Sequence, residues 1–172
     1  MKNLLLVYTA VSLIACNQHH TDKRTAAKDN IIYPFRAAYS SNLQVGSDPE
    51  NAKRMMQVWK FMEQGKPDSV RNIFADTLIF ESAEGARYIT PADSLVRQMK
   101  LYSMAIDSVR YDVNVWQTTH FPDTNDDWVN IWAIQRTYPK SGKPDTVKIQ
   151  ENWRMKNGRC VFINQYKARP VN

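Results

Sequence analysis

The sequence predicts an α+β domain in which helices cover one face of a curved antiparallel sheet. Three observations support this fold class. Two segments, opened at Asp48 and at Thr90, carry apolar residues at helical spacing. From Ile106 onward the sequence suggests only strands. The pair Asn157-Gly158 separates two alternating runs, which is the strongest short-range signal for a β-hairpin.

Residues 1–16 have the features of an export signal. Lys2 gives a positive start, and the apolar run that follows is too short to span a bilayer well. Its last four residues, Leu13 to Cys16, resemble the bacterial lipobox, in which the cysteine is lipidated and becomes the mature N-terminus. The resemblance implies a lipoprotein held on a membrane of the bacterial cell envelope through Cys16. A plain signal peptide and an uncleaved anchor are the alternatives.

Residues 17–47 are polar and mixed, and we expect them to form a tether. The rest of the chain, 48–172, is enough for one domain. The net charge of +6 is modest, and no basic run is interleaved with aromatic residues, so we expect no nucleic-acid partner. The 2 cysteines and 3 histidines show no ligand spacing, so we expect no metal and no cofactor.

The first helix is predicted to open at Asp48-Pro49-Glu50, where Asp48 can cap, Pro49 suits the first turn and Glu50 favours the helix dipole. Gly65 is expected to end it. Its apolar stripe contains Ala52, Met55, Met56, Trp59 and Met62.

Shorter elements are expected to follow. A short helix is predicted at 67–72 and a strand at 74–80. Thr90-Pro91-Ala92-Asp93 resembles a helix start, with Thr90 as the cap. Four long strands then follow: one includes residues 113–116, the next runs from 128 to 138, and the last two form the hairpin 147–166.

A two-residue turn at Asn157-Gly158 predicts the register of this hairpin. Because side chains alternate along a strand, one set of facing pairs shares an apolar, aromatic face, with Arg154 on the other face. The predicted pairs on the apolar face are Met155–Cys160, Trp153–Phe162, Glu151–Asn164 and Ile149–Tyr166.

The order of the elements, the Phe74-Ala75-Asp76 strand start and Asn152-Trp153-Arg154 before the Asn-Gly turn resemble the nuclear transport factor 2-like superfamily, which includes SnoaL-like domains. The resemblance covers roughly residues 48–169. It implies a cone-shaped sheet with helices packed on its concave face, closing one side of a cavity. Members of this superfamily include enzymes, subunits and binding modules, so the fold leaves the function open.

The predicted pocket has one acidic group, Glu151, set among apolar neighbours. A carboxyl in such surroundings has a raised pKa and can shuttle a proton, which makes Glu151 the candidate catalytic residue. The alternatives are a structural Glu151 paired with Asn164 or Arg136, or a sheet face open to water. The predicted pocket residues are Glu151, Asn164, Trp153, Phe162, Tyr166 and Trp59.

The resemblance also permits a test against the ketosteroid isomerases of the superfamily. Their catalytic aspartate aligns with Ser82, their oxyanion-hole tyrosine with Val58 and their oxyanion-hole acid with Glu151. Ser82 cannot act as that base and Val58 cannot donate a hydrogen bond, so that isomerase reaction is not expected.

Two classes of function therefore remain open. The domain binds a small, largely apolar ligand in the cone, or a protein partner, including a second copy of the chain, through the outer sheet. Alternatively, it is a SnoaL-like or isomerase-like enzyme that uses Glu151 as acid or base. A cavity that holds Glu151 and a second titratable group favours the enzyme, and a filled core favours an interaction module.

Overall fold

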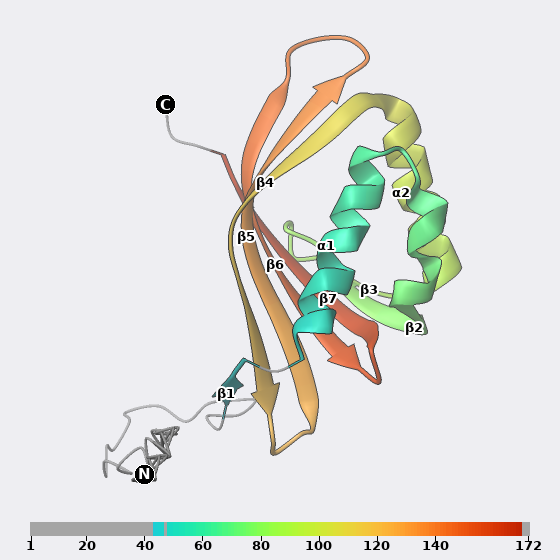
Figure 1. Cartoon of the computed structure of the whole chain (residues 1–172). Helices are drawn as coiled ribbons and strands as arrows, with labels where there is room; N and C mark the ends of the chain where they lie inside the picture. Colours follow the sequence, from blue (N-terminus) through green and yellow to red (C-terminus); the bar gives the residue numbers. More distant parts are fainter. Residues whose placement is uncertain (1–42, 47, 170–172) are drawn as a thin grey trace, which may run out of the picture. The chain divides into compact units, whose positions relative to one another are not determined.

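A computed structural model describes residues 43–46 and 48–169 of the chain, and Cys16 lies outside these residues (Figure 1). The helices are α1 (Pro49–Glu63), the 3₁₀ helix η1 (Pro67–Ile73) and α2 (Ala92–Ala105). The strands are β1 (Gln44–Val45), β2 (Phe74–Glu81), β3 (Arg87–Pro91), β4 (Ile106–Phe121), β5 (Asp126–Pro139), β6 (Asp145–Lys156) and β7 (Arg159–Ala168).

The strands of the described residues form one 7-stranded sheet in the order β1-β4-β5-β6-β7-β2-β3. Neighbouring strands are antiparallel, except that β2 and β7 run parallel. The long strands β4 to β7 curve, and α1 and α2 lie on one side of them (Figure 1). The predicted α+β class with helices on one face of a curved sheet is confirmed, and the parallel β2–β7 pair makes the sheet mixed.

Two short strands were not predicted from the sequence. β1 lies within the range 17–47 for which a tether was expected, and it pairs with β4 at Thr119 and His120. β3 includes Thr90, so the prediction that Thr90 caps α2 is wrong. Pro91 occupies the cap position without a side-chain hydrogen bond. Pairing of β3 with β2 provides partners for this backbone instead.

Helix α1 begins and ends as its sequence predicts. The Asp48 carboxylate accepts a hydrogen bond from the Glu50 backbone N–H (2.9 Å), and Gly65 takes a positive φ of 65° just past the helix. The predicted apolar stripe faces the sheet, where Met55 and Trp59 are 0% and 5% exposed. Burial of each such large side chain contributes about 1.5–3 kcal/mol, so this face holds α1 on the sheet.

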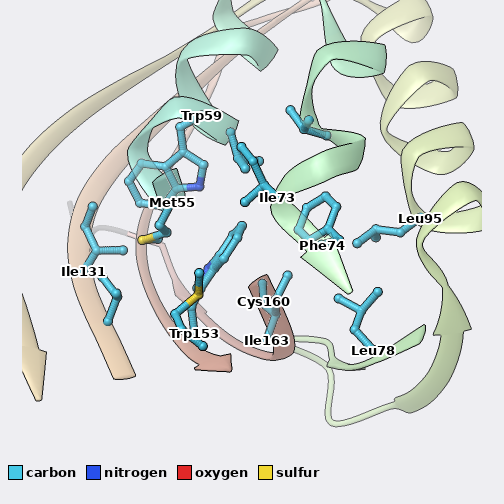
Figure 2. Close-up of a cluster of buried hydrophobic side chains, with 14 of the residues drawn as sticks. Met55, Trp59, Ile73, Phe74, Leu78, Leu95, Ile131, Trp153, Cys160 and Ile163 are labelled. Atoms are coloured by element: carbon cyan, nitrogen blue, oxygen red, sulfur yellow. The ribbon is translucent and has the colours of Figure 1, made fainter. Parts of the chain in front are cut away.

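The core lies between the helices and the inner face of the sheet. Figure 2 shows Trp153 near the middle of the cluster, with Met55 and Trp59 on one side and Phe74 and Leu95 on the other. The rings of Phe74 and Trp153 stack at a centroid distance of 5.7 Å. This packing fixes the inner face of β6 and therefore the side chains that alternate with Trp153.

The hairpin turn has the predicted geometry. Asn157 and Gly158 take φ values of 51° and 70°, as a type I′ turn requires. Met155 pairs with Cys160 as expected. The register then shifts, because Val161 is an extra residue on β7 that has no counterpart on β6.

Beyond this β-bulge the predicted pairs are wrong. Trp153 pairs with Ile163, Glu151 with Gln165, and Gln150 rather than Ile149 with Tyr166. β6 keeps its predicted facing, with Trp153 inside and Arg154 on the opposite face. Beyond the bulge, the side chains of β7 face the opposite way from the prediction, which places Phe162, Asn164 and Tyr166 on the outer face. The successive apolar residues Phe162 and Ile163 suit either face, and the bulge allows both Cys160 (0% exposed) and Ile163 (4%) to be buried.

Candidate functional site

A cavity of about 260 Å³ lies between α1, α2 and the inner face of the sheet. Its wall is formed largely by apolar side chains from both helices, β2 and β7, together with the rings of Trp59, Tyr111 and Trp153. The apolar residues include Val58, Met62, Phe80, Leu95, Met99 and Ile163. A cavity of this kind, with few polar groups, has the character of a small-molecule site.

Glu151 is the acidic group of the cavity wall and is 6% exposed. Its Oε2 atom accepts hydrogen bonds from the indole N–H groups of Trp59 (3.1 Å) and Trp153 (2.9 Å). Its Oε1 atom accepts a hydrogen bond from the Gln165 amide (2.6 Å). The carboxyl is therefore held rigidly by donors from three elements, α1, β6 and β7.

Local geometry explains how these donors meet. Trp153 lies two residues after Glu151 on β6, so both side chains point inward. Gln165 faces Glu151 on β7 only because the bulge at Val161 shifts the register. Trp59 lies on the apolar face of α1, which faces the sheet, and from there its indole N–H bonds to the same carboxyl.

Burial raises the pKa of Glu151 above its ordinary value of 4.5. The hydrogen bonds from Trp153, Gln165 and Trp59 and the charge of Lys167 act in the opposite direction. Within the described residues Glu151 makes no ion pair. Arg136, which the sequence suggested as a partner, pairs with Asp112 instead.

Tyr111 is a second titratable group in the cavity wall. Its ring stacks on Trp59, with a centroid distance of 4.7 Å and an interplanar angle of 13°. Burial, and next the neighbouring Glu151, raise the pKa of the Tyr111 phenol above its ordinary value of 10.0. The phenol therefore stays protonated at neutral pH and can donate a hydrogen bond, but it is not a base.

Polar side chains also occur elsewhere on the wall. Gln135 donates hydrogen bonds to the hydroxyl oxygens of Tyr102 (3.2 Å) and Thr137 (3.1 Å). The exposed side chains of Gln98 and Lys167 line the cavity as well. These groups give an entering molecule hydrogen-bond partners where the cavity meets solvent.

Half of the predicted pocket residues lie at this cavity. Glu151, Trp153 and Trp59 form part of its wall. Their role in binding or catalysis stays a prediction. Cys16, the predicted lipidation site, lies outside the described residues.

The other three predicted pocket residues lie on the outer face of the sheet. Asn164 donates a hydrogen bond to Glu81 (2.9 Å) and accepts one from Asn152 (3.3 Å). The Phe162 ring packs against Trp128 at 5.6 Å. Tyr166 is 55% exposed. Placing them in the pocket was wrong, because the prediction assumed a hairpin without a bulge.

Of the polar and aromatic residues that contact or lie beside Glu151, Tyr111 and Gln165 were missed by the sequence analysis. The alternation Val109-Arg110-Tyr111 was a usable signal for Tyr111, because residues two apart on a strand share a face. The structure buries Val109 on that face. No comparable signal marks Gln165. Of the positions aligned with ketosteroid isomerase, Val58 and Glu151 line the cavity, whereas Ser82 lies in the turn between β2 and β3.

The sequence matches no model of a protein family and no curated protein. Solved structures do resemble it. An LEH-like epoxide hydrolase from M. tuberculosis matches with a TM-score of 0.59 and 9% identity, over 72% of this chain and 86% of that one.

Two further solved structures are similar in the same way. A nuclear transport factor 2-like (NTF2-like) protein from Mesorhizobium loti has a TM-score of 0.52 and 17% identity, covering 70% of this chain and 92% of that one. A SnoaL-like protein from Shewanella putrefaciens, proposed to be a polyketide cyclase, has a TM-score of 0.55 and 8% identity, covering 71% and 82%. The chain therefore has the cone-shaped fold of NTF2-like and SnoaL-like proteins, and identities this low show the fold alone. None of the helices within 43–46 and 48–169 is both long and apolar enough to cross a membrane.

Proposed function

We propose that this domain binds a small, largely apolar molecule in the cavity beside Glu151. The observation that carries the proposal is the cavity itself: about 260 Å³ of space beside the buried apolar core and Glu151. A filled cone would have favoured a purely structural or interaction role. The rigidly held carboxyl supplies the precisely placed polar group that small-molecule sites combine with apolar walls.

Binding of a neutral apolar dye, N-phenyl-1-naphthylamine, followed by its fluorescence, tests this proposal. Met99→Trp fills the cavity from α2, whereas Met104→Trp makes the same change at an exposed position on the same helix. We expect dye emission to rise with wild type and with Met104→Trp, and to be lost with Met99→Trp. Equal emission from both variants would place the dye elsewhere and refute the proposal.

The second candidate is an enzyme of SnoaL-like or isomerase-like type. It is favoured by one observation, the presence of a buried phenol, Tyr111, in the same cavity wall as the buried carboxyl of Glu151. Glu151 would act as acid or base, and the Tyr111 hydroxyl would donate a hydrogen bond to charge that develops on the substrate. Under this proposal Glu151→Gln keeps ligand affinity but abolishes turnover, whereas loss of affinity alone supports a binding protein.

We also propose a cellular location, on the basis of the sequence alone. Cys16 becomes the lipidated N-terminus, and the acyl chains hold the domain on a membrane of the cell envelope. Mass spectrometry of membrane-extracted protein tests this. An unmodified N-terminus beyond Cys16, or unchanged membrane association of Cys16→Ala, contradicts it.

A protein partner, including a second copy of this chain, is proposed to dock on the outer face of the sheet. Facing positions there form a row of Val115, Trp132, Gln150 and Tyr166 across β4 to β7. Val115 and Tyr166 are 51% and 55% exposed, so this row presents an apolar and an aromatic side chain to solvent.

Sedimentation of the wild type and a Tyr166→Lys variant tests this partner proposal for the homodimer. We expect the wild type to sediment as a dimer and the variant as a monomer, because a buried unpaired charge opposes the interface. A monomeric wild type at high concentration rejects self-association.

A further inference from the structure

Glu151 has no charged hydrogen-bond partner in the described part of the chain, and this determines which ligands suit the cavity. Within residues 43–46 and 48–169 its carboxyl is bonded only to uncharged N–H groups, from Trp59, Trp153 and Gln165. The charge of Lys167 acts on Glu151 from the same cavity wall, but the Lys167 side chain is exposed and forms no ion pair with Glu151. A buried carboxylate without a cation is costly, and a ligand can remove that cost.

The remaining hydrogen-bonding capacity of the carboxyl is on one atom. A carboxylate oxygen accepts about two hydrogen bonds. Oε2 already accepts two, from the indoles of Trp59 and Trp153, so it is saturated. Oε1 accepts one, from Gln165, and has one position left among the described side chains. A ligand that meets this carboxylate must therefore present a donor to Oε1.

The aromatic wall favours a donor that is positively charged. The rings of Trp59, Tyr111 and Trp153 all border the cavity beside Glu151. Electron-rich ring faces attract ammonium groups, and the attraction grows when water is excluded. An anionic ligand would instead meet the charge of Glu151 in a setting that screens it poorly.

We propose that the ligand is a primary or secondary amine on an apolar body, bound as the ammonium ion with one N–H donating to Oε1 of Glu151. This deepens the proposed function and rests on it. The apolar body lies against Leu95, Met99 and Phe80, and the ammonium lies beside the aromatic rings. The volume of about 260 Å³ lies just below the usual range for ligand sites, which favours a compact amine.

Three probes with one apolar body test this inference by calorimetry at neutral pH. They are 3-phenylpropylamine, 3-phenylpropanol and 3-phenylpropanoic acid, which present an ammonium, a hydroxyl and a carboxylate. We expect the amine to bind at least about tenfold more tightly than the alcohol, because its hydrogen bond to the carboxylate is charge-assisted. The acid is expected to bind most weakly.

Glu151→Gln and Glu63→Gln are the matched variants. Glu63 is a carboxyl on the same helix as Trp59, and it lies outside the wall of this cavity. We expect Glu151→Gln to weaken amine binding about tenfold or more and to leave alcohol binding nearly unchanged. Glu63→Gln should leave both unchanged. The ranking of the probes with wild type needs no variant, so it tests the inference even where a variant does not fold.

Each result separates the inference from the proposed function. Equal binding of amine and alcohol, or amine binding that survives Glu151→Gln, overturns the amine inference and leaves apolar binding standing. Tighter binding of the acid overturns it as well. Failure of all three probes and of N-phenyl-1-naphthylamine overturns the proposed function and the inference together.

Discussion

Neutralising the buried carboxyl of Glu151 should change how the stability of the domain depends on pH. Burial raises the pKa of Glu151 in the folded chain above the ordinary value of 4.5 that applies when the chain unfolds. The folded state therefore binds this proton more tightly than the unfolded state. Stability is then highest at low pH with respect to this group, and it falls as the pH rises.

The magnitude follows from the linkage relation. Below the unfolded value of 4.5 the group is protonated in both states and has no effect. Between that value and the raised folded pKa, wild-type stability declines by up to about 1.4 kcal/mol per pH unit. Above the folded pKa the full penalty is present. Glu151→Gln cannot ionise, so this decline is absent from the variant.

Urea unfolding followed by circular dichroism measures the effect, from about pH 3 to about pH 8. The quantity to plot is the free energy of unfolding of wild type minus that of Glu151→Gln, because contributions from other groups cancel in the difference. Tyr111 and Cys160 also face this region, and their pKa values are raised above ordinary values of 10.0 and 9.0, so they titrate above this window. Lys167 and Tyr102 also line the cavity, but they are present in both wild type and Glu151→Gln, so their own contributions cancel in the difference.

Glu63→Gln supplies a control of opposite sign. Burial alone would raise the pKa of Glu63, but hydrogen bonds from Lys60 and the Tyr111 backbone N–H lower it below 4.5. Its stabilising contribution is present above 4.5 and is lost as the pH falls through the folded pKa. With rising pH, the difference plot should fall above 4.5 for Glu151, whereas for Glu63 it should rise below 4.5 and then stay level. A flat or rising plot for Glu151→Gln would refute the claim that the Glu151 carboxyl is buried without a cationic partner and has a raised pKa.

Further predictions concern the elements that position the site. Gly158→Ala places a Cβ at a φ of 70° and against the guanidinium of Arg54, which bonds to the Gly158 carbonyl (2.6 Å). In urea unfolding it should cost about 1–2 kcal/mol of strain plus about 1.5–3 kcal/mol for the lost bond to a charged donor. Gly85→Ala, in open space, should cost the strain alone, and equal losses would contradict a role for Arg54. Trp59→Phe keeps an aromatic ring but removes one donor to the buried carboxyl, so at neutral pH it should cost about 1.5–3 kcal/mol in the same assay; an unchanged midpoint would contradict the bond. Deleting Val161 removes the bulge and turns every later β7 side chain to the opposite face, so near-ultraviolet circular dichroism should show loss of the native aromatic packing, and a native spectrum would contradict the assigned register.

Much of the fold was predictable from local signals. Asp48, Gly65 and the Asn157-Gly158 pair act within a few residues of the chain, through a cap, a positive φ and a tight turn, and each appears where the sequence predicted it. Glu151 could be singled out because alternation along β6 places it between Ile149 and Trp153 on one face. Such signals depend on backbone periodicity, which the sequence carries directly.

The sequence by itself determined the fold class, the turn of the hairpin and the inward facing of Glu151 and Trp153. Only the tertiary structure decided which residues of β7 join them. A single extra residue, Val161, reverses a strand, and two adjacent apolar residues leave its alternation ambiguous. The bulge buries both Cys160 and Ile163 in the core, and this burial stabilises the fold more than regular pairing without a bulge would. As a result Gln165, rather than Asn164, bonds to Glu151. The approach of Trp59 and Tyr111 to that carboxyl likewise depends on how α1 lies across the sheet, which no local pattern specifies.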